Sequence, residues 1–435
     1  MKTRKIQRDK VNIITLGCSK NLVDSEVLSG QLQANEIDVV HESKKADHNI
    51  AVVNTCGFID KAKEESVNTI LQQVELKRRG KLEKVYVTGC LSERYRNDLA
   101  LEIPEVDAWF GTMELPLMLH RFNADYKKEL IGERLLATPQ HYAYLKISEG
   151  CNRTCAFCAI PLMRGAHVSK TIEEIISEAE TLVRKGVKEI MLIAQELTYY
   201  GLDIYKKRML AELLQRLSDV NGVQWIRLHY AYPNKFPFEI LDVMRERENI
   251  CNYLDMPLQH ASDAMLKAMR RQSTKAEVEE TIAQIRERVP GICLRTTLIA
   301  GFPGETRDDV EELKAFLVKH RFDRVGIFTY SHEEGTSAYS LQDDIAADEK
   351  EARAQEIMEV QQEISYEKNM EKIGKTFKVI IDKKEAGRYL GRTEFDSVEV
   401  DNEVVIHSQK KLIIGEFVQV KMTKAYDYDL EGQVV

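Results

Sequence analysis

The chain has 435 residues, of which 43% are hydrophobic and 30% are charged. This balance excludes collagen-like, disordered and membrane-spanning proteins, and at ~150 residues per domain the length indicates about three domains. The formal net charge is −8, so we expect no strong generic binding of nucleic acid, and a basic macromolecular partner suits the chain better. Eight Cys are too few for a disulfide scaffold, and no signal peptide or spanning stretch is evident, so we expect a reduced, cytoplasmic compartment.

Short apolar runs alternate with helical patterns from Val11 to about Gly111. The expected strands are Val11–Leu16, Ile50–Asn54 and Val85–Thr88, and the expected helices are Leu22–Leu32, Phe58–Leu76 and Ser92–Leu101. Such alternation is typical of a parallel sheet with covering helices. We therefore predict an N-terminal parallel α/β domain over residues 9–125, with a polar linker at Phe122–Pro139.

A longer alternation of the same kind begins at Tyr142. The expected strands are Tyr144–Ile147, Glu189–Ala194, Val223–His229, Tyr253–Pro257, Ile292–Ile299 and Val325–Tyr330. The expected helices include Ile172–Lys185, Phe236–Arg247, Lys275–Val289 and Asp308–His320. This predicts a central (β/α) partial barrel over residues 140–370, which ends in a long charged helix at Ala346–Lys372.

The composition changes at Gly374. From Phe377 to Val435 Val, Ile, Phe and Tyr alternate with polar residues at period two, with turn signals at Ala386-Gly387 and Asp401-Asn402. The pattern predicts a small antiparallel β-barrel over residues 374–435, and the fold class of the whole chain is α/β.

The strongest chemical signal is Cys151, Cys155 and Cys158, in the pattern C-x3-C-x2-C just after a predicted strand; we call them the second thiol trio. Thiolates favour zinc or iron–sulfur clusters as partners. A structural zinc site needs four closed ligands, and His167 is the lone candidate nearby. A 4Fe-4S cluster on these three thiolates would leave one iron open to a small molecule. Three buried or zinc-binding cysteines are the alternative.

Cys18, Cys56 and Cys90, the first thiol trio, each follow a predicted strand, with separations of 38 and 34 residues. Because ligands bind at the shared carboxyl edge of a parallel sheet, we expect these thiolates to converge there, and their neighbouring glycines to allow close approach to a cluster. The alternative is three unrelated buried thiols. Cys251 and Cys293 lack such partners, and we interpret them as structural.

The second thiol trio, with an aromatic residue at Phe157, resembles the signature of the radical S-adenosylmethionine (SAM) superfamily. In that superfamily the open iron binds the amino and carboxylate groups of SAM. Gly301 lies in AGFPGET (Ala300–Thr306), where glycines allow a close approach to SAM, although an ordinary β–α turn also explains them. Gln195 and Glu196 end a predicted strand at the place where the superfamily contacts the SAM amino group.

Nearly the whole chain resembles the methylthiotransferase family, and its C-terminal part resembles a TRAM domain. Members of that family insert a methylthio group at an unactivated C–H bond. One branch modifies tRNA adenosines, and another modifies the β-carbon of an aspartate in a small-subunit ribosomal protein, the S-twelve protein. The runs similar to the ribosomal branch are GCSKNLVDSE (Gly17–Glu26), DMPLQHASD (Asp255–Asp263) and EEGT (Glu333–Thr336).

The resemblance implies a transferase whose cofactors are two 4Fe-4S clusters and SAM. The second thiol trio is then catalytic, because its cluster reduces SAM to a radical that removes hydrogen from the target carbon. The cluster on the first thiol trio would carry the incoming sulfur, which a second SAM methylates. The resemblance also implies that both clusters face one cavity.

The charge of the C-terminal module helps to distinguish a protein substrate from an RNA substrate. Residues 374–435 carry 10 Lys and Arg and 11 Asp and Glu. An RNA-binding module should present a basic footprint, so this near-neutral module favours the basic ribosomal protein, alone or within the ribosome, although a local patch can hide within a neutral total. A tRNA methylthiotransferase with the same cofactors is the alternative, and a non-catalytic metal scaffold that docks on ribosomes is a third hypothesis.

Overall fold

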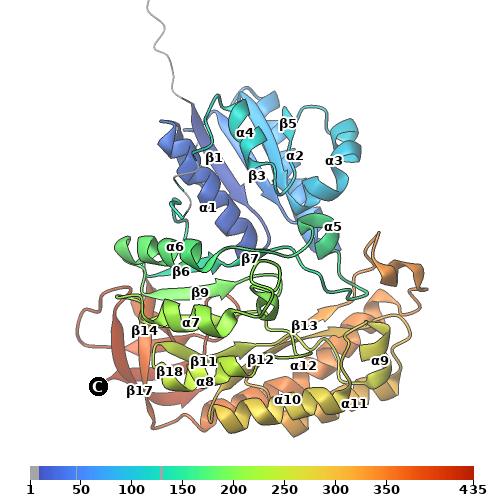
Figure 1. Ribbon diagram of the computed structural model, residues 1–435, viewed down its shortest axis with the longest axis vertical. Helices are drawn as coiled ribbons and strands as arrows, with labels where there is room; N and C mark the ends of the chain where they lie inside the picture. Colours follow the sequence, from blue (N-terminus) through green and yellow to red (C-terminus); the bar gives the residue numbers. More distant parts are fainter. Residues whose placement is uncertain (1–8, 46, 128–129, 131) are drawn as a thin grey trace, which may run out of the picture. The chain divides into compact units, whose positions relative to one another are not determined.

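The computed structural model describes residues 9–45, 47–127, 130 and 132–435 (Figure 1). The chain divides into two compact units. Unit 1 comprises Met1–Thr138, Glu149–Asn152 and Ala159–Thr181, and unit 2 comprises Pro139–Ser148, Arg153–Cys158 and Leu182–Val435. Within the described ranges, no helix has both the length and the apolar character that a membrane crossing requires.

Unit 1 is built on a parallel five-stranded sheet with the order β2–β1–β3–β4–β5. Its strands are β1 (Lys10–Thr15), β2 (Asp38–His41), β3 (Ile50–Thr55), β4 (Lys84–Gly89) and β5 (Ala108–Trp109). Its helices are α1 (Ser19–Ala34), α2 (Asp60–Arg78), α3 (Cys90–Glu102), α4 (Leu115–Arg121) and α5 (Ile160–Arg164), and it also contains β8 (Val168–Ser169). The predicted parallel sheet is confirmed. The prediction missed β2, β5 and α4, which are too short to show a period.

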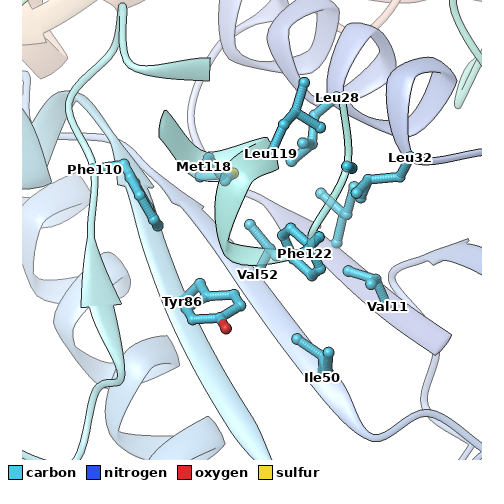
Figure 2. Packing of buried hydrophobic residues seen from close by; sticks show 12 residues of the cluster. Val11, Leu28, Leu32, Ile50, Val52, Tyr86, Phe110, Met118, Leu119 and Phe122 are labelled. Atoms are coloured by element: carbon cyan, nitrogen blue, oxygen red, sulfur yellow. The ribbon is translucent and has the colours of Figure 1, made fainter. Parts of the chain in front are cut away.

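Alternation along the strands gives the sheet two apolar faces. Figure 2 shows one face, where Val52 and Tyr86 pack beneath residues of α1 and α4. The rings of Tyr86 and Phe122 meet edge to face, with centroids 5.2 Å apart. On the opposite face Val85 and Val87 pack against α2 and α3. Helices therefore cover both sides, as a buried parallel sheet requires.

The segment predicted as a linker is in part folded into unit 1. Phe122 is buried in the core, and the side chain of Arg134 is fully buried. Arg134 forms an ion pair with Glu26, and its Nε lies 3.1 Å from Oε1 of Glu178. The polar composition of this segment is misleading, because paired carboxylates allow a charged side chain to be buried. Residues 128, 129 and 131 of the predicted linker lie outside the described residues.

Unit 2 contains a parallel six-stranded sheet with the order β13–β12–β11–β10–β9–β6, which confirms the predicted partial barrel. The strands are β6 (Tyr142–Lys146), β9 (Glu189–Ile193), β10 (Trp225–Leu228), β11 (Ile250–Asp255), β12 (Cys293–Ala300) and β13 (Arg324–Thr329). The helices of this unit are α7 (Leu210–Ser218), α8 (Glu239–Glu246), α9 (Asp263–Ala268), α10 (Lys275–Arg288), α11 (Arg307–His320) and α12 (Ala347–Met370). Short 3-10 turns lie at Leu197–Tyr199 and Ser337–Ser340, while β7 (Ser148–Glu149) and α6 (Ile172–Arg184) cross unit boundaries along the chain.

The C-terminal strands form a closed barrel with the order β14–β15–β16–β18–β17. They are β14 (Thr376–Glu385), β15 (Arg388–Thr393), β16 (Val404–His407), β17 (Phe417–Ala425) and β18 (Leu430–Val434). The predicted turn joins β14 to β15, with φ of 47° at Ala386 and 82° at Gly387. Every pair of neighbours is antiparallel except β16–β18, which is parallel; an alternating pattern does not report strand direction.

Buried ion pairs fix this barrel to the sheet of unit 2. Arg392 of β15 donates to Glu189 of β9 at 2.6 Å and to Asp382 of β14 at 2.8 Å. Arg227 of β10 donates to the same Glu189 at 2.9 Å. Burial raises the pKa of Glu189, but Arg392 and Arg227 lower it more, so its pKa lies below the ordinary value and the carboxylate is ionised.

Candidate functional site

The first thiol trio lies at the carboxyl ends of three adjacent parallel strands. Cys18 precedes α1, Cys56 follows β3, and Cys90 begins α3 directly after β4. Strands β1, β3 and β4 are consecutive in the sheet, so these ends share one edge. Cys56 and Cys90 are buried, while Cys18 is exposed.

Two glycines let the three loops pack closely at this edge. Gly17 has φ of +91°, and a Cβ placed on it would lie 2.8 Å from the sulfur of Cys56. Gly89 has φ of +96°, and a Cβ there would lie 2.5 Å from the carbonyl oxygen of Thr55. Both positions combine a left-handed backbone with a contact that excludes a side chain.

Hydrogen bonds join the same loops. Asn21 donates through Nδ2 to the carbonyl oxygens of Leu16 at 2.8 Å and Thr55 at 3.0 Å. Asn54 in turn donates to the carbonyl oxygen of Asn21 at 2.8 Å, and the Thr55 hydroxyl donates to Thr88 at 2.6 Å. The backbone that carries the thiols is therefore held by the protein itself.

The thiols are electrostatic neighbours. The pKa of Cys56 is raised to about 12, chiefly by burial; the nearby Cys18 and Cys90 also raise it, while a backbone hydrogen bond at Phe58 and the charge of Arg164 lower it. Burial likewise raises the pKa of Cys90. At neutral pH these two buried thiols hold their protons, and a metal that binds them must displace the protons.

This donor set fits an iron–sulfur cluster, because each thiolate of such a cluster binds a different iron and the sulfurs need not meet at one ion. Across the described part of the chain, no group of three or more His, Cys, Asp or Glu side chains is close enough to hold a single metal ion.

The second thiol trio is divided between the two units. Cys151 belongs to unit 1, where its backbone N–H donates to the carbonyl oxygen of Gly165 at 3.1 Å. The neighbouring Gly150 has φ of +75°, and a Cβ there would lie 2.1 Å from the carbonyl oxygen of Ala166. The backbone before and at Cys151 is thus closely packed against residues 165–166.

Cys155 and Cys158 belong to unit 2, at the carboxyl side of β6. The N–H of Cys158 donates to the carbonyl oxygen of Cys155 at 3.2 Å. Arg271 donates through Nη1 to the Cys155 sulfur at 3.2 Å, and the Tyr232 hydroxyl lies 3.8 Å from that sulfur. The aromatic Phe157 packs against a buried apolar cluster of unit 2.

Glu196 is already heavily engaged. Its carboxylate accepts from Arg153 at 2.9 and 3.1 Å and from the backbone and hydroxyl of Thr198 at 2.7 and 2.5 Å. The Arg153 guanidinium lies 4.1 Å from the ring centre of Tyr199 and 3.7 Å from that of Tyr232. Both Glu196 and Arg153 are buried, so this pair fixes the loop between Cys151 and Cys155.

Gly301 lies in a turn that the protein itself completes. It has φ of +76°, and its N–H donates to Oε2 of Glu305 at 2.9 Å. Arg353 of α12 donates to the same oxygen at 2.9 Å, and Nε2 of His260 lies 3.3 Å from the other oxygen. The motifs around His260 and Gly301, which the sequence singled out separately, thus meet through one buried carboxylate.

The two remaining cysteines lie outside both trios, and three residues that contact a trio were not predicted. Cys251 and Cys293 are buried in an apolar cluster of unit 2, in keeping with a structural role. Sequence reasoning missed Asn21, Arg164 and Arg271, although each contacts a cysteine of one trio. No spacing rule distinguishes an isolated Arg that contacts sulfur from one that is solvated.

The fold and the cysteine loop define a radical SAM protein. Residues 145–317 match the family described as the Radical SAM superfamily. Residues 10–111 match Uncharacterized protein family UPF0004, and residues 373–435 match the TRAM domain.

Solved structures share the fold. The radical S-adenosylmethionine methyltransferase TsrM from Kitasatospora setae, which has cobalamin and a 4Fe-4S cluster bound, is 14% identical, with a TM-score of 0.56 over 74% of this chain and 75% of that one. The cobalamin-dependent radical enzyme OxsB is 13% identical, with a TM-score of 0.53 over 82% of this chain and 56% of that one.

Much more similar sequences identify the family. The ribosomal protein uS12 methylthiotransferase RimO of Flavobacterium johnsoniae is 58% identical over 100% of both chains. The proteins of the same name from Cytophaga hutchinsonii and Bacteroides thetaiotaomicron are 57% and 54% identical, over 100% and 99% of both chains respectively. The chain therefore belongs to the RimO type of the radical SAM methylthiotransferase family.

Proposed function

We propose that this chain adds a methylthio group to the β-carbon of an aspartate in the small-subunit ribosomal protein uS12. The observation that carries the proposal is 54–58% identity, over at least 99% of the chain, to proteins named ribosomal protein uS12 methylthiotransferase RimO. The near-neutral C-terminal barrel supports a protein substrate, free or within the ribosome, over a bare RNA.

The proposed cofactors are SAM and two 4Fe-4S clusters, one on each thiol trio. When bound, they supply the radical chemistry that an unactivated C–H bond requires and that no side-chain base provides. The first thiol trio supplies three sulfur ligands on loops fixed by Asn21 and Asn54. The second thiol trio supplies three sulfur ligands from one loop, with Arg271 donating to the Cys155 sulfur.

Phe157, Gln195, Glu196 and Gly301 are the proposed SAM-binding residues. Phe157 would offer an apolar side chain, and Gly301, whose N–H already donates to Glu305, would allow a close approach of the backbone. Glu196 would first have to exchange one of its four existing hydrogen bonds before it could accept from the SAM amino group. Its ion pair with Arg153 meanwhile holds the cysteine loop.

We also propose three functional domains: a methylthiotransferase domain at 9–125, a radical SAM domain at 140–370 and a TRAM-like domain at 374–435. The family matches at 10–111 and 145–317 lie within the first two of these domains, and the match at 373–435 supports the third. The proposed place of action is the cytoplasm, where ribosomal proteins are found.

The test is complementation. A bacterial strain that lacks its own uS12 methylthiotransferase is transformed with this chain, and uS12 peptides and total tRNA nucleosides are analysed by mass spectrometry. We expect a methylthio group on one uS12 aspartate and none added to tRNA. Methylthiolated adenosine together with unmodified uS12 would establish the tRNA-modifying alternative instead. A variant with Ala at all three positions of the second thiol trio serves as the inactive control.

A further inference from the structure

Arg164, at the end of α5, lies against the first thiol trio although it follows the second trio in sequence. Its Nε lies 3.3 Å from the sulfur of Cys90, and its side chain is only 2% exposed. Both residues belong to unit 1, where α5 packs beside α3, which begins at Cys90 (Figure 1). An arginine is always protonated and can only donate, so the sulfur is the acceptor.

The rest of the guanidinium is held by three other groups. Nη1 donates to Asp24 at 2.6 Å and to Glu149 at 3.3 Å, and Nη2 donates to the side-chain oxygen of Asn21. The two carboxylates compensate the buried positive charge. Because the guanidinium is planar and its other edges are fixed, the Nε–H is aimed at the Cys90 sulfur before any metal binds.

The next residue contacts a cysteine of the other trio. The carbonyl oxygen of Gly165 accepts from the backbone N–H of Cys151 at 3.1 Å. Arg164 and Gly165 thus contact one cysteine of each trio within unit 1, one through a side chain and one through the backbone. A movement of this dipeptide would displace a ligand of both.

We propose that Arg164 is a positioning residue of the first thiol trio: it holds the Cys90 sulfur in its ligand position and, by donating to it, raises the reduction potential of the cluster bound there. The inference rests on the proposed function, which places a cluster on this trio. Hydrogen bonds to ligand sulfurs and the net charge around a cluster are the terms by which a protein sets its potential. A guanidinium supplies both, and it favours the reduced, more negative cluster.

The experiment isolates the first trio in the full-length chain. In a background with Cys151, Cys155 and Cys158 changed to Ala, the protein is reconstituted anaerobically with iron and sulfide. Iron is then counted, and the midpoint potential is measured by redox titration followed by electron paramagnetic resonance. The variants are Arg164→Gln, Arg164→Lys and, as a matched control, Arg271→Gln, because Arg271 donates to a sulfur of the second trio at 3.2 Å.

Arg164→Gln should shift the midpoint potential to a more negative value, or lose iron while the far-ultraviolet circular dichroism stays that of the parent. Arg164→Lys keeps the charge and should shift it less, and Arg271→Gln should leave both iron content and potential unchanged. Asp24→Asn, which removes a negative charge beside the same guanidinium, should shift the potential the other way.

Two results overturn the inference in distinguishable ways. If the parent binds a cluster whose potential and iron content are the same in Arg164→Gln and Arg164→Lys, Arg164 only pins α5, and the inference fails while the proposed function stands. If the parent background binds no cluster at all, the proposed role of the first thiol trio fails, and the inference fails with it.

Discussion

The two thiol trios are assembled by different means. The first collects its cysteines from three strand ends, 38 and 34 residues apart, and its geometry exists only when β1, β3 and β4 pair in register. The second lies within eight consecutive residues, so the conformation of one loop sets the spacing of its cysteines. A defect in sheet packing should therefore damage the first trio selectively, whereas the second depends on the loop and on the residues that hold it, such as Arg153.

The largest effect is expected from removing either trio, and it separates their roles. With Ala at Cys18, Cys56 and Cys90, the protein should still cleave SAM anaerobically but yield no detectable methylthio product. With Ala at the second thiol trio, both SAM cleavage and product should be lost. The measurement is chromatographic detection of 5′-deoxyadenosine together with mass spectrometry of the uS12 peptide. Full product formation without the first trio would reject its role as sulfur carrier.

Glu189→Gln tests the buried ion pairs at the start of β9. This strand belongs to unit 2, which also contains two cysteines of the second trio. The substitution leaves Arg227 and Arg392 buried without their shared carboxylate, and we expect a loss of about 3–5 kcal/mol in the free energy of unfolding. Because the pKa of Glu189 is lowered in the folded state, its stabilisation is present above its ordinary value of 4.5 and is lost as pH falls through the folded pKa. Urea unfolding at several pH values measures both effects.

The matched control for that change is Glu416→Gln. Glu416 pairs with Lys188 at 2.6 Å between the same barrel and sheet, but it is exposed, so its loss should cost about 0–1 kcal/mol. Neither change should lower the iron bound by the first trio, which lies in unit 1. If the two variants lost the same free energy of unfolding, burial of the Glu189 ion pairs would contribute nothing to stability.

Gly17→Ala tests the dependence of the first trio on close packing. The new Cβ would meet Cys56 at 2.6 Å from a backbone with φ of +91°, so we expect about 1–3 kcal/mol of destabilisation and reduced iron binding at the first trio. Gly80→Ala is the control, with φ of +69° and nothing within 4 Å of its Cβ, and should cost about 1–2 kcal/mol without loss of iron. Iron binding equal in the two variants would contradict a role for this contact.

The smallest expected effect is a pH dependence of the metal-free, reduced protein. Burial raises the pKa of Cys56 from 9.0 to about 12, so its contribution to stability is complete below pH 9 and declines as pH rises toward 12. Between pH 9 and 10 this amounts to about 1 kcal/mol. Urea unfolding across this range should show a shallower decline in Cys56→Ala than in Cys18→Ala, since Cys18 is exposed. Parallel declines in the two variants would contradict the burial of an unionised Cys56.

The architecture could be predicted from the sequence because its strands and helices are long enough to show their periods. For the strands around Ile50 and Glu189, and for the barrel after Gly374, the predicted bounds agree with the observed bounds to within a few residues. The predictions that failed concern short or non-local features. Strand β5 spans only two residues, and the parallel pairing of β16 with β18 depends on the direction in which each strand runs, which composition does not show.

The site was predictable only in part. Cysteines are rare, so their spacing alone predicted which thiols to group. Arg164 and Arg271 could not be predicted, because their contacts with sulfur depend on how α5 and the segment after α9 fold back on the cysteine loops. The ion pair between Arg153 and Glu196 was also missed. The sequence suggested that Glu196 contacts a ligand, and it gave no sign that a residue of the protein pairs with this carboxylate.

Counting iron tests the central claim, two clusters on two trios, most directly. The anaerobically reconstituted full-length chain should contain about eight iron atoms, and each triple-Ala variant about four, with the spectrum of a 4Fe-4S cluster in both. A variant without the first thiol trio that retains all the iron of the parent protein would contradict the account.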